Sequence, residues 1–249
     1  VVPDILMNLA DANNRLGKLD IGAAWYRRAL LMCDSLHIAS TKKPPIYYGL
    51  AQVYVTMRDF EQCDYYYNLA GESYDNMLPY EKYIYLNNRG TSYYYREDYQ
   101  TAIKYFQKVI DLVEGYDDMS FELNLGRLNL GDCYLQLNMV DLAVKYINEC
   151  QLFFEEMGVS TALYYIDTQK IELALLQKDF QEARRLLSES VVPPGIDPDM
   201  VHIRNKYLQQ FYEETGNYKR AYHYLQRNNQ LDDSIRNERV RMRTADLTL

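Results

Sequence analysis

The stretch "GTSYYYREDYQTAIKYF", residues 90–106, contains four positions that recur along the chain. The small residue Gly90 is followed three residues later by Tyr93, nine residues further by Ala102, and four residues after that by Phe106. A small residue lets two helices approach closely, and a large ring fills the space that remains between them. The spacing therefore predicts two helices that pack against each other across a short turn.

The same four-position pattern occurs six times. Its second and third members are nine residues apart in every copy, and successive third members are 38 to 41 residues apart. The third members are Gly22, Cys63, Ala102, Ala143, Ala183 and Ala221. Six units of this length cover nearly all of the 249 residues, so no second domain is needed.

The sequence of each repeat is typical of a helical hairpin. Apolar residues recur at helical spacing, as in Ala102, Phe106, Val109 and Ile110, and a short polar turn followed by an aromatic residue separates the two halves, as in "EDY" at 97–99. A single hairpin cannot bury its apolar face, but stacked hairpins can. We therefore predict an all-α fold.

The pattern resembles the tetratricopeptide repeat, in which Gly-x2-Tyr is followed by Ala-x3-Phe. The second, third and fourth repeats match this pattern well. The usual Trp is missing, and the period exceeds the standard 34 residues. The resemblance implies a right-handed α-solenoid of about six hairpins over residues 1–230. A C-terminal capping or linker helix is then expected at residues 231–249.

In tetratricopeptide arrays the first helix of each hairpin lines a concave groove, and Tyr94 and Tyr95 rotate about 100° and 200° away from the core position of Tyr93. Aromatic rings beside amides and carboxylates suit a peptide or protein ligand. The alternative, that these rings pack against the next repeat, stays open. By resemblance the peptide-binding groove would comprise Asn14, Arg15, Tyr48, Gln52, Asn87, Thr91, Tyr94, Tyr95, Leu128, Asp132, Leu135, Gln136 and Glu172.

Composition limits the classes of function. Apolar residues make up 48% and charged residues 25% of the chain, which is typical of a folded protein. The net charge of −8 argues against general nucleic-acid binding, which needs a basic face. No apolar run reaches the ~18–20 residues of a membrane span. Either the cytoplasm or the periplasm is compatible with these properties, and we expect any export signal or membrane anchor to lie outside this segment.

The sequence carries no recognisable catalytic motif. The three histidines lack partners at metal-binding spacing, and neither a phosphate-binding glycine loop nor a Gly-x-Ser-x-Gly elbow is present. The four cysteines form no Cys-x-x-Cys pair and are expected to be buried free thiols. We therefore expect no catalytic residue, no metal site, no cofactor and no enzymatic activity.

The C-terminal stretch "LDDSIRNERVRMRTADLTL", residues 231–249, contains neither Gly nor Pro and is predicted to be helical. Residues 236–243 include four arginines and one glutamate. Leu231, Ile235 and Met242 are spaced like a short coiled-coil stripe, which indicates a possible homodimer contact. A solvated capping helix is the alternative.

The long repeats followed by this basic helix also look like the sensor region of bacterial regulators, in which a tetratricopeptide array precedes a helix-turn-helix domain. That resemblance implies a protein or peptide ligand and a sensory role in a signalling or transcriptional regulator. Four arginines would then lie where the signal leaves the array: Arg236, Arg239, Arg241 and Arg243. The competing interpretation is a static assembly scaffold, and no DNA-binding motif lies within these residues.

Overall fold

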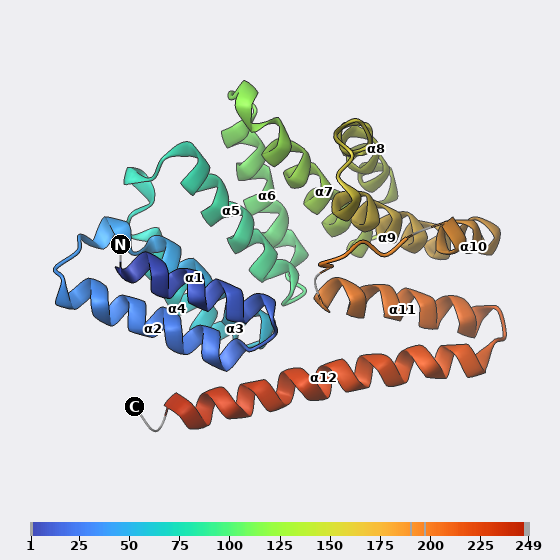
Figure 1. Ribbon diagram of the computed structural model, residues 1–249. Coiled ribbons are helices and arrows are strands. Elements are labelled where there is room, and N and C mark those ends of the chain that lie inside the picture. Colours follow the sequence, from blue (N-terminus) through green and yellow to red (C-terminus); the bar gives the residue numbers. More distant parts are fainter. Residues whose placement is uncertain (1, 190, 197, 247–249) are drawn as a thin grey trace. The chain divides into compact units, whose positions relative to one another are not determined.

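The computed structural model describes residues 2–189, 191–196 and 198–246, and in these ranges the regular structure is entirely helical (Figure 1). Three short 3-10 turns, Ser40–Lys42, Tyr74–Asn76 and Asp117–Met119, join some of the hairpins. The α-helices are α1 (Val2–Arg15), α2 (Leu19–Ser35), α3 (Pro44–Thr56), α4 (Phe60–Gly71), α5 (Pro79–Tyr94), α6 (Tyr99–Val113), α7 (Ser120–Gln136), α8 (Val140–Met157), α9 (Ser160–Leu176), α10 (Phe180–Glu189), α11 (Pro198–Glu214) and α12 (Tyr218–Asp246).

Consecutive helices form six hairpins, from α1–α2 to α11–α12, so the all-α prediction and the helical-repeat prediction are confirmed. Helix α12 continues without a break from Tyr218 to Asp246. A separate terminal segment at residues 231–249 therefore stays a prediction, and its last three residues, 247–249, lie outside the described residues.

The residues group into two compact units. Residues 1–105 together with residues 233–249 form the first unit, and residues 106–232 form the second. The first unit thus contains α1 to α5, the beginning of α6 and the end of α12. The second unit contains the remainder of α6, α7 to α11, and the beginning of α12.

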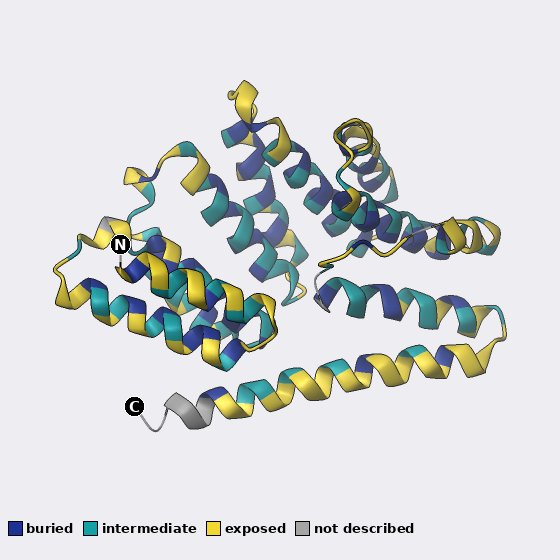
Figure 2. Ribbon diagram, viewed as in Figure 1, coloured by how far each residue is buried: buried dark blue, intermediate teal, exposed yellow. Residues whose placement is uncertain are grey.

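The small residues predicted from the repeat lie where helices touch. All six third members of the pattern are buried, and Figure 2 shows buried positions along the inner faces of the hairpins. A Cβ atom added to Gly131 would lie 3.1 Å from Ile147 Cγ1. On the neighbouring helices α2 and α3, one added to Gly49 would lie 2.1 Å from Tyr26 Cζ. Close helix approach is therefore the reason for these glycines.

All six hairpin turns share one geometry, with a residue whose φ lies between 56° and 78°. In the third hairpin this residue is Glu97, and the following N–H, of Asp98, donates to the Tyr93 carbonyl at 3.0 Å. This is a Schellman ending of the first helix. The Asp98 carboxylate then accepts from the Thr101 N–H at 3.1 Å, which caps α6. The repeated aromatic position thus also marks the end of the first helix.

Four hairpins contain a stacked pair of tyrosines, twelve residues apart, one from each helix. The pairs are Tyr54–Tyr66, Tyr93–Tyr105, Tyr134–Tyr146 and Tyr212–Tyr224, with ring centroids 5.5 to 5.8 Å apart. Such stacking adds about 0.5–1.5 kcal/mol beyond the buried area. Tyrosines in these repeats therefore join the two helices of a hairpin.

Burial differs among the tyrosines of the repeat. Tyr218, which follows the last hairpin turn, is 72% exposed, whereas Tyr26, Tyr54 and Tyr67 are buried. Most of α12 is exposed, as Figure 2 shows, because no further hairpin among the described residues covers its outer face. Position in the repeat is therefore a poor guide to burial in the outermost hairpin.

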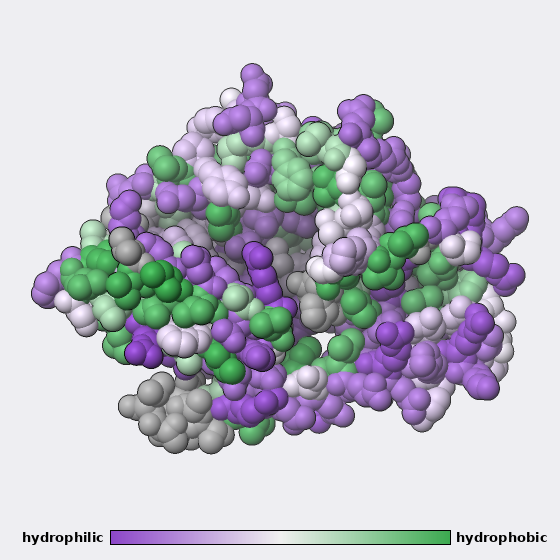
Figure 3. Space-filling view, viewed as in Figure 1, coloured by the Kyte–Doolittle hydropathy of each residue, from purple (hydrophilic) through white to green (hydrophobic). Residues whose placement is uncertain are grey.

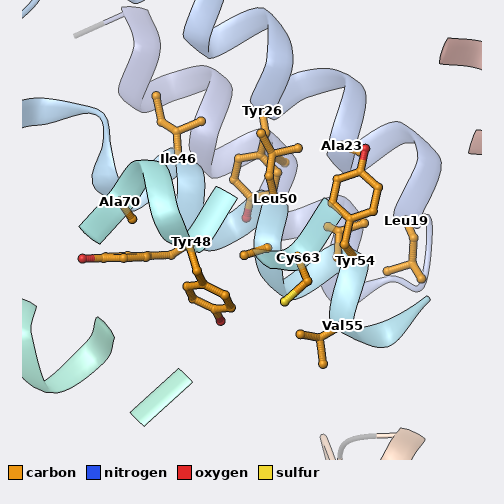
Figure 4. Close-up of a cluster of buried hydrophobic side chains, with 14 of the residues drawn as sticks. Leu19, Ala23, Tyr26, Ile46, Tyr48, Leu50, Tyr54, Val55, Cys63 and Ala70 are labelled. Atoms are coloured by element: carbon orange, nitrogen blue, oxygen red, sulfur yellow. The ribbon is translucent and has the colours of Figure 1, made fainter. Parts of the chain in front are cut away.

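Each unit has its own apolar core. In the first unit Tyr26, Leu50 and Cys63 lie inside a cluster built mainly by α1 to α4 (Figure 4). In the second unit one cluster includes Phe154 and another includes Phe211. The four cysteines are free and buried, as predicted.

No helix among the described residues is long and apolar enough to cross a membrane, and no group of His, Cys, Asp or Glu among them could hold a metal ion. The outer face of α1 presents Val2, Ile5 and Leu9 to solvent, and Figure 3 shows this apolar strip over the helix.

Candidate functional site

The first helices of the last three hairpins, all in the second unit, meet in a polar network. Gln136 ends α7, Glu172 lies in α9, and Tyr207 lies in α11. The Gln136 amide Nε2 donates to the two Glu172 carboxylate oxygens at 2.9 and 3.1 Å and to the Tyr207 hydroxyl at 3.3 Å. With Asp132, whose charge acts on Glu172, these residues form what we call the acidic network.

Glu172 is an unusual carboxylic acid because it is only 8% exposed. Burial raises its pKa to about 8, and the charge of Asp132 adds to this effect. Hydrogen bonds from Tyr207 and Gln136, and the charge of Lys206, act in the opposite direction but do not overcome burial. Glu172 is therefore mostly protonated at neutral pH.

The same buried environment shifts the pKa of the Tyr207 hydroxyl. Burial raises the pKa of its hydroxyl well above the usual value, and the neighbouring charge of Glu172 raises it further. The tyrosine consequently stays protonated and can donate a hydrogen bond to the Glu172 carboxyl group. The network can therefore exchange one proton, at Glu172, near physiological pH.

The repeat explains why these groups converge. Asp132 and Glu172 each follow the first member of the pattern, Gly131 in α7 and Ile171 in α9. Equivalent residues of stacked repeats lie on the same face of successive first helices. Two acids in one repeat position are thus brought close together although they are 40 residues apart in the sequence.

A buried arginine lies one helical turn from the network. Arg204 of α11 donates to the Thr168 hydroxyl at 2.9 Å and to the Tyr164 carbonyl at 3.4 Å, and its guanidinium carbon lies 4.3 Å from the Tyr164 ring centroid. Burial lowers the pKa of Arg204. These contacts fix α9 against α11 and so hold Glu172 and Tyr207 in place.

In the first unit, Tyr94 and Tyr95 are half-buried and pack edge to face, with ring centroids 5.6 Å apart. Tyr94 also meets Tyr99 at 5.5 Å. The Arg58 guanidinium lies 4.8 Å from the Tyr95 ring centroid, and Arg58 donates to the Tyr95 carbonyl at 3.2 Å. Both tyrosines therefore have partners within their own unit, and their role as ligand contacts stays a prediction.

The other polar candidates of the first unit make local contacts. Arg15 is exposed at the end of α1, and Gln52 is half-buried in α3. Asn14 donates to the Tyr26 hydroxyl at 3.5 Å. In α5, Thr91 donates to the Asn87 carbonyl at 3.0 Å. These contacts lie within or between adjacent helices, and a role of these residues in a ligand groove stays a prediction.

Four candidate groove residues are buried, and three of them, Tyr48, Leu128 and Leu135, are corrected because they lie in the apolar cores, whereas Glu172 lies in the polar network. The Tyr48 hydroxyl donates to the Met77 sulfur at 3.3 Å inside the first unit. The two leucines belong to the apolar cluster around Phe154. First-helix residues that face the adjacent helices fill the core, so helical position alone placed them incorrectly on the surface.

The sequence prediction missed Tyr207 because it lies outside the four repeated positions, two residues before Gln209, the first member of the sixth copy. It also missed an ion cluster in the first unit, where Asp64 accepts from Arg89 at 2.6 Å and from Arg96 at 2.8 Å. Both arginines lie over the Tyr93 ring. A charged residue at an unrepeated position gives no signal in a single sequence.

Comparison with known proteins identifies the repeats. Residues 83–116 and residues 126–152 each match a family model described as tetratricopeptide repeat. The curated relative "Anaphase-promoting complex subunit CDC16" of Saccharomyces cerevisiae is 26% identical over 163 residues. That alignment covers 64% of this chain and 18% of the yeast protein.

Solved structures show the same fold at low sequence identity. A Rap protein complexed with Competence and Sporulation Factor has a TM-score of 0.71 at 15% identity, with 95% of this chain and 65% of that chain covered. Aspartyl phosphate phosphatase F from Bacillus subtilis has a TM-score of 0.69 at 16% identity, with 92% and 59% covered. The chain thus spans less than two thirds of each of these relatives.

Proposed function

We propose that this chain, a tetratricopeptide-repeat protein and hence a protein-interaction module, is the sensory region of a signalling or transcriptional regulator. In this proposal a peptide or a segment of a partner protein binds the acidic network of the second unit. The observation that carries it is the hydrogen-bonded arrangement of Gln136, Glu172 and Tyr207, one residue from each of three consecutive first helices. A ligand that contacts all three can change how these helices pack.

The chemistry of the network favours a ligand that carries a positive charge. Glu172 forms no ion pair among the described residues, and it is protonated at neutral pH because burial disfavours its charge. A lysine, an arginine or an N-terminal amine placed beside it would restore a charge partner and favour ionisation. Binding of such a ligand would therefore release a proton from Glu172.

This coupling predicts how affinity depends on pH. Because the ligand favours the ionised carboxylate, its affinity should rise with pH until the pH exceeds the pKa of about 8. Between pH 6 and pH 8 the increase approaches about tenfold per pH unit, the limit for one coupled proton. Replacing Glu172 by Gln should remove the dependence.

The experiment is selection from a displayed random peptide library with the whole chain, followed by titration of the selected peptides at pH 6 to 8.5. We expect selected peptides to be enriched in Lys and Arg and to lose affinity for the Glu172→Gln variant. Glu156→Gln, at an exposed glutamate of α8, is the matched control. Equal binding by the wild type and Glu172→Gln would place the ligand elsewhere and refute the site.

A static scaffold is the second candidate, because the curated relative is named as a subunit of the anaphase-promoting complex. By contrast, one structural neighbour is described in complex with Competence and Sporulation Factor. Hydrogen exchange with and without a selected peptide separates the two roles. A sensor should show changed protection in α7, α9 and α11, whereas a scaffold should show protection only at the contact.

A further inference from the structure

The last turns of α12 pack against the first unit through one face. Ile235, Glu238 and Arg239 are half-buried, and Met242 is buried, whereas Asn237 and Arg241 are exposed. The covered positions are separated by three or four residues, which puts them on one side of a helix. The end of α12 therefore packs with one helical face against the rest of the first unit.

Met242 supplies the apolar part of this contact. Only 2% of it is exposed, and it belongs to the core cluster of the first unit together with Tyr54 and Met57. Arg239 and Met242 line a pocket together with Met57 and Asp59 of the α3–α4 turn and Glu61 of the first turn of α4. The flexible thioether side chain suits an irregular surface of this kind.

Arg239 supplies the polar part. Its guanidinium donates to the carbonyl oxygen of Met57, the C-cap residue that follows α3. The last carbonyls of a helix lack partners within the helix and attract cations. Asp59 and Glu61 at the same pocket add negative charge. The surface thus complements an arginine followed three residues later by an apolar side chain.

The contact also leaves polar atoms without partners. Glu238 Oε2 and Arg239 Nε are buried without a hydrogen-bond partner. Buried unsatisfied atoms weaken a contact, because each loses its hydrogen bonds to water without replacement. The docked contact is therefore weaker than one in which every buried polar atom is paired.

From these contacts we infer that the α3–α4 turn of the first unit is a docking surface for a basic helical segment. Residues 233–246 of the same chain occupy it as an intramolecular ligand. The docked segment controls access to the surface, and a partner helix with Arg and Met at the same spacing competes for it. This inference is independent of the ligand proposed for the second unit.

The docked segment is also connected, through the α3–α4 turn, to Tyr95, one of the candidate ligand contacts. Arg239 binds the carbonyl of Met57, and the next residue, Arg58, holds the carbonyl and ring of Tyr95. Arg58 has a φ of 57°, so the turn is held in a conformation unusual for a non-glycine residue. Release of the segment should therefore loosen the position of Tyr95 as well.

The test uses the whole chain and a fluorescent peptide with the sequence of residues 231–246. In the wild type the tethered segment competes at an effective concentration of roughly millimolar, so the free peptide should bind weakly. In full-length Met242→Asp the surface is vacated, and the peptide should bind about tenfold or more tightly. Asn237→Asp, which adds the same charge on the exposed face, should behave like the wild type.

Several results decide the inference. A peptide that itself carries Met242→Asp should not bind to either protein, and a helical circular dichroism spectrum should show that full-length Met242→Asp is folded. Hydrogen exchange at residues 235–242 should accelerate in Met242→Asp and in a second variant, Arg239→Ala. Equal peptide affinity for the wild type and folded Met242→Asp, or unchanged exchange in both variants, would overturn the inference. A wild-type dimer that Met242→Asp converts to a monomer would also overturn the intramolecular docking.

Discussion

Replacing Glu172 by Gln should stabilise the second unit at alkaline pH. The carboxyl group is buried, and its pKa of about 8 lies above the ordinary value of 4.5. The folded state therefore keeps a proton that the unfolded state loses. Stability is highest below the unfolded pKa and falls as the pH rises, until Glu172 is ionised in both states.

The magnitude follows from the two pKa values. Between pH 4.5 and about 8, one proton difference lowers the unfolding free energy by about 1.4 kcal/mol per pH unit. The complete loss would be about 5 kcal/mol, and coupling to Asp132 reduces what a single substitution recovers. We expect Glu172→Gln to gain about 2–4 kcal/mol over the wild type at pH 8.5 and little at pH 5.

Urea unfolding of the wild type and Glu172→Gln, followed by circular dichroism between pH 5 and pH 9, measures this difference. Glu156→Gln, at an exposed position, should follow the wild type. Carboxyl ¹³C chemical shifts should give the pKa of Glu172 directly. Parallel stability curves for the wild type and Glu172→Gln, or a Glu172 titration near 4.5, would refute the reasoning.

Other predictions test the packing of the repeats. Gly49→Ala should lower the unfolding free energy by roughly 1–3 kcal/mol, since the added Cβ would lie 2.1 Å from the buried Tyr26 ring. Gly115→Ala is the control and should leave the stability unchanged, because its added Cβ would meet no neighbouring atom within 4 Å. Thermal melts compare the two. Asp64→Ala should cost about 2–3 kcal/mol by leaving a buried arginine without its carboxylate. Burial raises the pKa of Asp64, but the hydrogen bonds and charges of Arg89 and Arg96 outweigh it, so the pKa is lowered overall. The stability lost in Asp64→Ala should therefore shrink as the pH falls. Equal losses of stability at neutral and acid pH would contradict this account. A double-mutant cycle of Tyr134→Leu and Tyr146→Leu should give a coupling of about 0.5–1.5 kcal/mol, and additive losses would exclude a specific stacking contribution.

Much of the local architecture was predictable because it depends on residues close together in the sequence. A small residue every 38 to 41 positions marked the helix contacts, and "EDY" at 97–99 marked a turn that ends one helix and caps the next. Each of these features is set by steric or hydrogen-bonding preferences of a few neighbouring residues. The tyrosine pairs were predictable in principle from their constant separation of twelve residues.

The candidate site was only partly predictable. Repeat position brought Asp132, Gln136 and Glu172 into one candidate set, and the structure places them together. The same logic wrongly placed Leu128 and Leu135 on the surface, because the face of a first helix that meets its neighbours depends on how each pair of helices is rotated. Rotation is a property of packing and is not encoded at any single position.

The sequence alone determined the helical repeat, its period and its turns, because helix periodicity, small residues and capping act over short distances. Only the tertiary structure decided the environment of each charge. Glu172 is an ordinary glutamate in the sequence, and burial between α7 and α11 raises its pKa to about 8. Met242 and Arg239 likewise become docking residues only where the end of α12 meets the turn after α3. Desolvation and docking depend on groups far apart in the chain, so they are set by the fold.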